Sequence, residues 1–295
     1  MQHIDLHCHS LYSDGTMTPV ELVKMARQEK LAGLALTDHD TIAGVPELLA
    51  AAAAIGLAAV SGVELSANHG DIPIHILGYG FDPAASTLNQ DLARLQATRE
   101  RRNEKIIANL GDVGIEVTLA EIKTIAGQGV VGRPHFGQLL MQRGKVRSLQ
   151  EAFRRYLGRG KPAYAAREKL PVAEAIRIIK RAGGVAVLAH PGVIPLDNRK
   201  TLTLINEFLA MGLDGLEVYY PGHTPMLRRQ LLSLCDKENL VVTGGSDYHG
   251  DIRPATRLGA IGKEQRIPLD LLHRLQEHIS STTRLYAKNA YHSHR

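Results

Sequence analysis

Cysteine, tryptophan and uninterrupted apolar runs are scarce in this sequence. Its 295 residues include two cysteines, Cys8 and Cys235, and no tryptophan, and aromatic residues make up only 4%. Because neither cysteine belongs to a CxxC pair, the sequence argues against thiolate zinc sites and against a disulfide framework. The small aromatic content argues against an aromatic stacking surface for single-stranded nucleic acid.

Signals for export or membrane insertion are also missing. The N-terminus has no basic stretch followed by an apolar one, so no signal peptide is predicted. The apolar run at residues 45–60 is interrupted by Pro46, Glu47 and Gly56 and is too short to span a bilayer. We therefore expect a cytoplasmic protein without a membrane partner. The formal net charge of +5 suits an anionic substrate, although solubility alone would account for it.

Strand and helix patterns alternate along most of the chain. The first helix is expected from Thr18 and Pro19, a helix cap followed by a proline in the first turn. This alternation implies a parallel sheet of seven strands, either closed as a barrel or open and doubly wound. The expected strands lie at residues 3–8, 31–40, 57–67, 72–81, 184–191, 212–220 and 240–250.

The alternation stops at residues 86–161. This stretch has a helical, heavily charged pattern, as in "LARLQATRERRNEKIIANL", and contains no segment typical of a buried strand. We interpret it as an inserted helical subdomain. An insertion after the fourth strand would cover the end of the sheet where that strand finishes, and would favour small substrates.

Clusters of histidine and carboxylate residues follow the predicted strands. The carboxyl ends of strands carry the active site in barrels and in open α/β sheets, so these side chains should meet. They include no thiolate, which suits Mn²⁺, Fe²⁺ or Zn²⁺. They are too many for one ion and imply two or three, with Glu64 as the bridging carboxylate. The candidate ligands are His7, His9, Asp14, His39, Glu64, His75, His190, Asp247 and His249.

The motifs "HCHS…SDG", "TDHD", "GVE", "AHP" and "SDYH" together resemble those of the polymerase and histidinol phosphatase (PHP) superfamily. This resemblance implies an α/β fold, a distorted (β/α)7 barrel formed by residues 1–85 and 162–295, with residues 86–161 as the inserted helical subdomain that caps the active site. It also implies a trinuclear metal centre and phosphoesterase activity. The histidine and carboxylate set without cysteine favours Mn²⁺, and the lack of an evident nucleophile favours attack on the phosphate by metal-bound hydroxide.

The same resemblance distributes the ligands over three ions. One ion takes His7, His9, Glu64 and Asp247, a second takes Glu64, His75 and His190, and a third takes Asp14, His39 and His249. Asp14, His39, Glu64 and His249 are also expected to be catalytic. Asp40 is expected to orient one of the histidines from outside the ligand set.

Residues of the insertion are candidates for substrate binding. Arg99 and Arg102 share one face of a helix, and "VGRPHFG" presents Arg133, Pro134 and His135 in a shaped segment. Guanidinium groups suit phosphate oxygens, and a histidine can donate a proton to phosphate or to a leaving oxygen. Two plainer interpretations stay open. Arg99 and Arg102 could belong to a solvated charged helix face, and "VGRPHFG" could be an ordinary helix start.

With "GRPH" in its insertion, the chain resembles the nucleoside 3′,5′-bisphosphate phosphatase branch, which includes enzymes that trim RNA from the 5′ end. The resemblance implies hydrolysis of the 3′-phosphate of a nucleotide, with short RNA or DNA oligonucleotides as further substrates and no obligate protein partner. Alternatives are a phosphatase of the histidinol phosphate type, an amidohydrolase, a DNA proofreading exonuclease and a non-catalytic metal-dependent nucleotide-binding module. Release of phosphate, release of ammonia and turnover by metal-loaded protein distinguish these classes.

Overall fold

One eight-stranded sheet forms the centre of the molecule. The structure, a computed structural model, describes residues 2–166, 168, 170–262 and 265–292, with side chains described as far as residue 282. The strand order is β7-β6-β5-β4-β3-β2-β1-β8. The strands are β1 (His3–Cys8), β2 (Leu31–Leu36), β3 (Ala58–His69), β4 (Ile72–Tyr79), β5 (Val185–Leu188), β6 (Gly215–Tyr219), β7 (Val241–Gly244) and β8 (Ile267–Pro268).

The two sides of this sheet meet where the chain passes from β7 towards residue 249. Cys8 at the end of β1 forms a parallel bridge with Tyr248. The Asp247 N–H donates to the His7 carbonyl and the His9 N–H to the Tyr248 carbonyl, each at 2.9 Å. The sheet is therefore nearly closed into a barrel, which confirms the expected distorted barrel fold.

The expectation of an all-parallel sheet of seven strands was wrong. β3 and β4 form an antiparallel hairpin, β4 and β5 are antiparallel, and the short eighth strand runs antiparallel to β1. Only residues 70 and 71 separate β3 from β4, and Gly70 adopts a left-handed backbone with φ of 57°. Two residues are too few for the crossover helix that parallel neighbours require.

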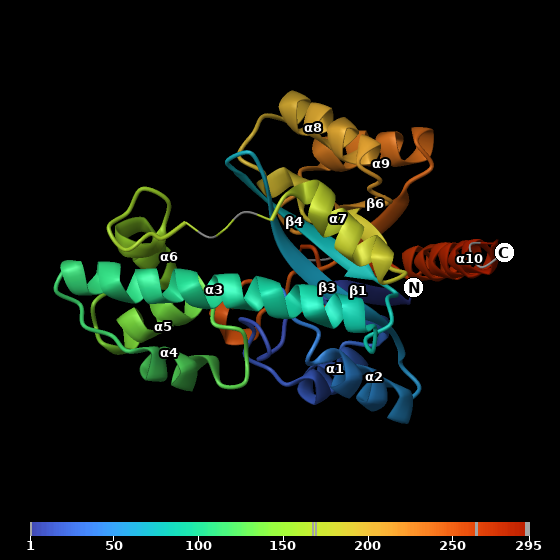
Figure 1. Cartoon of the computed structure of the whole chain (residues 1–295). Coiled ribbons are helices and arrows are strands. Elements are labelled where there is room, and N and C mark those ends of the chain that lie inside the picture. The colour runs from blue at the N-terminus through green and yellow to red at the C-terminus, as the bar shows by residue number, and fades with distance from the viewer. Residues whose placement is uncertain (1, 167, 169, 263–264, 293–295) are drawn as a thin grey trace.

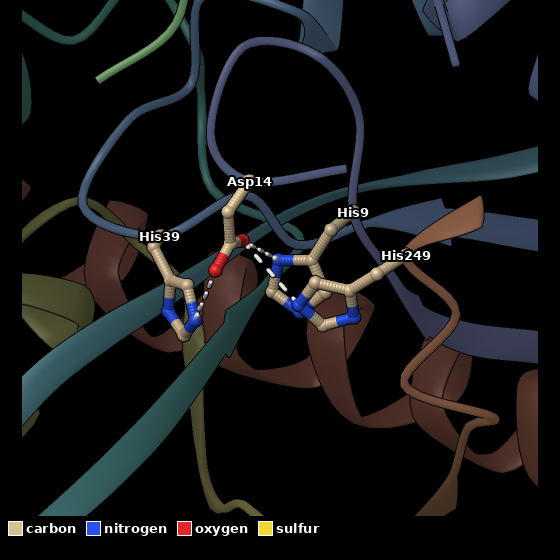
Figure 2. Close-up of side chains that lie close together, drawn as sticks. All are labelled: His9, Asp14, His39 and His249. Atoms are coloured by element: carbon tan, nitrogen blue, oxygen red, sulfur yellow. Dashed lines mark ion pairs between the residues drawn. The ribbon is translucent and has the colours of Figure 1, made fainter. Parts of the chain in front are cut away.

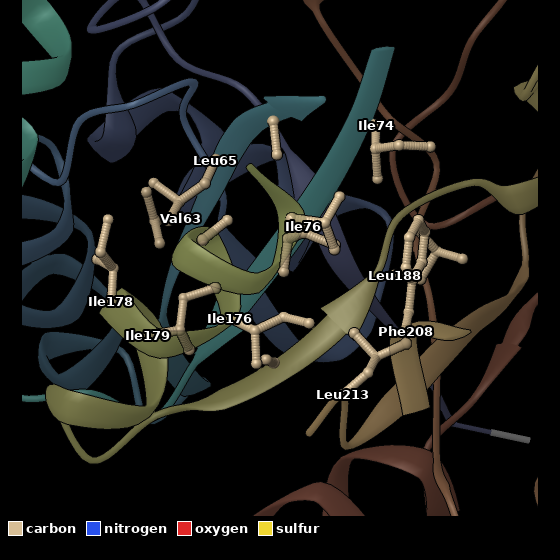
Figure 3. Close-up of a cluster of buried hydrophobic side chains, with 14 of the residues drawn as sticks. Val63, Leu65, Ile74, Ile76, Ile176, Ile178, Ile179, Leu188, Phe208 and Leu213 are labelled. Carbon is tan, nitrogen blue, oxygen red and sulfur yellow. The ribbon is translucent and has the colours of Figure 1, made fainter. Parts of the chain in front are cut away.

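Six helices cover the outside of the barrel (Figure 1). Thr18 caps the first of them, accepting a hydrogen bond from the Glu21 N–H, as the Thr-Pro pair predicts. Ile176 and Ile179 of α7 belong to the same buried cluster as Val63 and Ile76 of β3 and β4 (Figure 3). The helices are α1 (Pro19–Gln28), α2 (Val45–Ala54), α7 (Val172–Arg181), α8 (Asn198–Ala210), α9 (Pro225–Lys237) and α10 (Asp270–His292).

The segment between β4 and α7 is helical and has a buried cluster of its own. It contains α3 (Ser86–Asp112), α4 (Leu119–Ala126), α5 (Arg133–Gln142), α6 (Leu149–Ala152) and a π-helical turn at Phe153–Leu157. α3 runs along one side of the molecule, and α4, α5 and α6 lie around the half of α3 far from the barrel (Figure 1). The separate buried cluster includes Ile106, Leu110, Ile122, Phe136 and Leu157.

The long helices α3 and α10 do not resemble membrane spans. α3 carries Arg94, Arg99, Arg101 and Arg102 along its length. Within the described residues, we find no helix that combines the length and the hydropathy needed to cross a bilayer.

Candidate metal centre

All nine predicted ligands come together at one rim of the barrel. His7 and His9 are two residues apart on and just after β1, so their side chains share a face. Glu64 and His75 come from the β3–β4 hairpin, and the others come from loops that follow β1, β2, β5 and β7. Figure 2 shows four of them, His9, Asp14, His39 and His249, converging from three different loops.

Glu64 lies at the centre of this group. Its Oε1 atom is 2.8 Å from His75 Nδ1 and 2.9 Å from His190 Nε2. Its Oε2 atom is 3.0 Å from His39 Nδ1 and between 3.3 and 3.4 Å from the Nε2 atoms of His9 and His7. Each oxygen therefore faces a different set of histidines, which is the geometry that a carboxylate bridge between ions requires.

Four overlapping groups within the cluster bring at least three potential ligand atoms within 4.8 Å of one another. Two groups correspond to the first and third sets that the motif resemblance implies. The second set is divided, because Glu64 belongs to one group with His190 and to another with His75. The groups are His7, His9 and Asp247; His7, Glu64 and His190; His39, Glu64 and His75; and His9, Asp14, His39 and His249.

Several buried polar atoms in the cluster have no hydrogen-bond partner among the described residues. They are Asp14 Oδ1, His39 Nδ1, Glu64 Oε2 and His249 Nε2. Leaving a buried donor or acceptor unsatisfied costs about 1–3 kcal/mol for each group. All four atoms belong to predicted ligands and are nitrogens or carboxylate oxygens, so divalent cations of the Mn²⁺, Fe²⁺ or Zn²⁺ type fit this centre.

The electrostatics of the cluster favour cation binding. Burial alone raises the pKa of Asp14, Glu64 and Asp247, but the neighbouring histidines more than offset it and hold the pKa of all three carboxyls well below the usual value. Burial lowers the pKa of His39 to about 3, so this imidazole is neutral, as a ligand must be. The rim thus presents three carboxylates to a bound ion.

The carboxylates around His7 and His9, which lie on and just after β1, favour the protonated imidazoles before an ion binds. Burial lowers the pKa of His9, but the neighbouring Asp247 and Glu64 carboxylates raise it to about 9. The carboxylates of Glu217, Glu64 and Asp247 likewise outweigh burial at His7 and raise its pKa well above the usual value. Metal binding must displace these protons, because only neutral imidazole binds a metal.

Two further carboxylates, which no motif predicted, hold the ligands in place. Glu217 of β6 is fully buried, accepts a hydrogen bond of 2.9 Å from His7 Nδ1 and one of 2.7 Å from the His190 N–H. Asp38 accepts from the hydroxyls of Ser10 and Ser13 and so fixes the loop that carries Asp14. A lone carboxylate inside an apolar strand, as in "GLEVY", was the available signal for Glu217.

Asp247 is divided between two environments. Its Oδ1 atom lies 3.5 Å from His7 Nε2 and 3.3 Å from His9 Nε2. Its Oδ2 atom accepts hydrogen bonds from the Tyr220 hydroxyl, at 3.0 Å, and from Arg253 Nη1. One oxygen is thus available to a cation while the other is held from outside the cluster, an arrangement that no sequence motif indicated.

Three residues at this rim have a left-handed backbone although none is glycine. The φ angles are 54° at Asp40, 30° at His190 and 53° at Asp247. Positive φ is uncommon outside glycine and occurs preferentially at functional sites, where the surrounding structure imposes it. Here it turns the chain sharply at the ends of β2, β5 and β7.

The insertion reaches the rim through Arg99 of α3. Arg99 is buried, and its guanidinium pairs with the Asp40 carboxylate, with 2.7 Å between Nε and Oδ2, and donates to Ser66 Oγ at 3.0 Å. Asp40 therefore anchors the insertion to the barrel, which is a different role from the expected orientation of a histidine. One turn further along α3, Arg102 is also buried and donates to the Asn103 side chain.

Arg133, Pro134 and His135 form the first turn of α5. The Arg133 guanidinium lies 5.5 Å from the centre of the Phe153 ring and 5.8 Å from that of Tyr164, and has no carboxylate partner among the described residues. Burial and the nearby Arg99 lower its pKa. The buried His135 accepts a hydrogen bond from the Gly132 N–H at 2.9 Å and also bonds to the Ser13 backbone. The start of α5 is thereby joined to the Asp14 loop.

This chain is similar in sequence and in structure to known phosphoester hydrolases. Residues 5–161 match the PHP domain family. A 5′-3′ exoribonuclease of Haemophilus influenzae is 39% identical over 83% of this chain and 89% of that protein. A 3′,5′-nucleoside bisphosphate phosphatase of Chromobacterium violaceum is 36% identical over 84% of this chain and 88% of that protein. A metal-dependent phosphoesterase structure from Bifidobacterium adolescentis covers 93% of this chain and 95% of its own, with 34% identity and a TM-score of 0.83.

Proposed function

The chain belongs to the PHP domain family of metal-dependent phosphoesterases, and on that premise we propose that it removes the 3′-phosphate from nucleoside 3′,5′-bisphosphates. The carrying observation is the proximity of two different cationic subsites. The nine-residue ligand cluster would be one when divalent ions are bound, and the arginines at the junction of α3 and α5 are the other. A substrate with two phosphates on one nucleoside fits that pair.

The scissile phosphate is assigned to the ligand cluster. His7, His9, Asp14, His39, Glu64, His75, His190, Asp247 and His249 would hold two or three divalent ions, with Mn²⁺ as our first choice. Bound ions would supply an acidified water and neutralise the charge of the phosphate. Glu64 lies between the two halves of the cluster and contacts histidines of both. Glu217 fixes the ring of His7 through a hydrogen bond. Tyr220 and Arg253 hold the Oδ2 atom of Asp247. Asp14, His39, Glu64 and His249 lie nearest the reacting atoms in this proposal.

The 5′-phosphate is assigned to Arg99, Arg102 and Arg133, with Pro134 and His135 shaping the start of α5. Arg133 has no carboxylate partner among the described residues and is largely buried, whereas the nearby Arg99 is already paired with Asp40. A phosphate dianion would supply the missing counter-charge to Arg133 through paired N–H donors. His135 would position this subsite relative to the cluster through its hydrogen bond to Ser13.

The same placement accommodates an oligonucleotide. In a 5′-phosphorylated RNA, the first nucleotide also carries a phosphate on its 3′ oxygen, which is esterified to the next nucleotide. Holding the terminal 5′-phosphate at the arginines brings that phosphodiester to the cluster, and its hydrolysis releases one nucleotide from the 5′ end. The exoribonuclease and bisphosphatase activities named for the relatives thus need only one binding mode.

We further propose that residues 86–161 form a capping subdomain. They include the helices α3 to α6, they contain most of a separate buried cluster, and they contact the rim through Arg99 and His135. A cap of this kind limits the space above the cluster, so we expect mononucleotides and single-stranded ends to be accepted and duplexes to be excluded.

Steady-state hydrolysis of matched nucleotides tests the proposed function. Metal-reconstituted protein should release phosphate from adenosine 3′,5′-bisphosphate with a kcat/KM about tenfold or more above that for adenosine 3′-monophosphate, because only the former has a phosphate for the arginine subsite. Adenosine 5′-monophosphate should be the product and should resist further hydrolysis. Equal kcat/KM for the bisphosphate and the 3′-monophosphate, or release of the 5′-phosphate, would overturn the assignment.

A further inference from the structure

The positive charge of this protein is concentrated in one short stretch of the insertion, residues 143–161, which we term the basic segment. It contains seven lysines and arginines and a single acid, Glu151, and therefore has a formal charge of +6. The whole chain has +5, so all the other residues together carry −1. The seven cations are Arg143, Lys145, Arg147, Arg154, Arg155, Arg159 and Lys161.

The cations of the basic segment are displayed at the surface and are only partly neutralised. Glu151 Oε1 pairs with Arg155 Nη1 at 3.0 Å, and its Oε2 accepts from the Arg147 backbone N–H at 2.8 Å. Lys145, Arg147 and Arg154 are exposed and form no ion pair among the described residues. Together with Glu151 and Arg155 they line a hollow of about 760 Å³. A patch of this kind attracts a polyanion.

Both ends of the basic segment are tied to structures that lead to the metal centre. At one end it continues from α5, a ten-residue helix about 15 Å long whose first turn contacts the Asp14 loop. At the other end, Arg159 pairs with Asp71 at 3.3 Å, in the turn of the β3–β4 hairpin. Asp71 lies four residues before His75, or about 13 Å along an extended strand.

We propose that the basic segment binds the phosphodiester backbone of a single-stranded oligonucleotide whose 5′ end occupies the metal centre, an inference that rests on the proposed function. The length of α5, about 15 Å, corresponds to four or five stacked nucleotides at ~3.4 Å each. Downstream phosphates of an RNA of five or more residues therefore reach the segment, and mononucleotides do not. The segment supplies charge rather than ring stacking, which agrees with the few aromatic residues of the chain.

A membrane surface fits the basic segment less well than a nucleic acid. Peripheral helices bind bilayers by burying an apolar face beside their charges. The apolar side chains Val146, Ala152 and Leu157 point inward and are buried. The segment thus offers charge without the apolar anchor that a lipid headgroup layer requires.

Binding of an RNA hexamer to metal-depleted protein tests the proposal without turnover. The double variant Arg147→Glu with Arg154→Glu should bind a 5′-phosphorylated, 3′-labelled hexamer about tenfold or more weakly in fluorescence anisotropy. Loss of two phosphate contacts should reduce the slope of log affinity against log salt by about 1.4. The matched control, Arg199→Glu with Arg229→Glu, makes the same charge change at exposed positions of α8 and α9 and should bind like wild type.

Hydrolysis by the metal-loaded proteins separates this proposal from the proposed function. The Arg147/Arg154 variant should hydrolyse adenosine 3′,5′-bisphosphate within twofold of wild type and lose about tenfold in kcat/KM on the hexamer. Equal weakening of hexamer binding by both double variants would overturn the proposal, as would loss of binding to phosphatidylserine vesicles with RNA binding unchanged. Failure of wild type to hydrolyse the bisphosphate would refute the proposed function, while the binding comparison would still decide whether the segment holds RNA.

Discussion

The barrel rim and the insertion use polar residues in opposite ways. At the rim, histidines and carboxylates from different strands and loops are buried or half-buried and lie close to one another, and the backbone turns sharply at three of these positions. In the insertion, each cation has a separate environment. Some, such as Arg99, pair with one carboxylate, Arg133 lies over an aromatic ring, and others are exposed. The difference suits the two tasks that we propose, chemistry on a phosphate at the rim and selection of the substrate by the insertion.

Replacing Glu64 should have the largest effect, because it removes the centre of the rim. Glu64→Ala should lower kcat/KM by on the order of a thousandfold or more with every phosphate ester, since a bridging ligand supports several kcal/mol of charge stabilisation. Metal counting on the purified variant should show a deficit of more than one ion, whereas His39→Ala should lose mainly one. Equal metal losses in the two variants would contradict the bridge.

Replacing Arg133 should have a smaller effect that depends on the substrate. Arg133→Ala should lower kcat/KM on adenosine 3′,5′-bisphosphate by roughly ten- to a hundredfold, because a charge-assisted hydrogen bond to phosphate contributes about 1.5–3 kcal/mol. The loss should largely vanish with adenosine 3′-monophosphate, and Arg133→Lys should recover part of it. An equal loss of kcat/KM on both substrates would show that this arginine acts outside the 5′-phosphate subsite. The insertion would then have no demonstrated part in substrate selection.

The smallest effect concerns the stability of the rim without its ions. The pKa of His9 is raised to about 9 from its ordinary value of 6.5, so its stabilising protonation is complete below pH 6.5 and is lost as pH rises to 9. Metal-depleted protein should therefore lose a few degrees of Tm between pH 6.5 and 9. His39, whose pKa is lowered, affects stability only below pH 6.5.

Metal-loaded protein provides the comparison for this pH series. Binding requires neutral imidazole, so affinity for the ion increases with pH through the same window, and Tm should hold or rise. Thermal unfolding in chelator and in saturating Mn²⁺, at constant ionic strength, measures both curves. A Tm of the metal-depleted protein that rises from pH 6.5 to 9 would contradict the charge assignment of His9.

The candidate ligands were predictable because strand ends follow a simple rule. His7 and Asp247 come at or just after the end of an apolar strand, and parallel strands bring such ends to one edge. Glu64 lies inside β3, a strand longer than expected. The antiparallel direction of β4 was missed because it is set by a two-residue turn, which the apolar pattern does not reveal. Arg253 was not predicted because its role at the site depends on its hydrogen bond to Asp247, which the sequence does not show. For the same reason, sequence alone could not pair Arg99 with Asp40.

The closure of the barrel between Cys8 and Tyr248 has a consequence for the way this protein is made. His7 and His9 are synthesised early, but Asp247 and His249, which complete their surroundings, follow some 240 residues later. A chain still under translation holds only a partial ligand set on an open sheet, and bringing its ends together carries the entropy cost of a very long loop. A chain that ends before Asp247 lacks two of the nine candidate ligands, so we expect truncated translation products to have no hydrolytic activity.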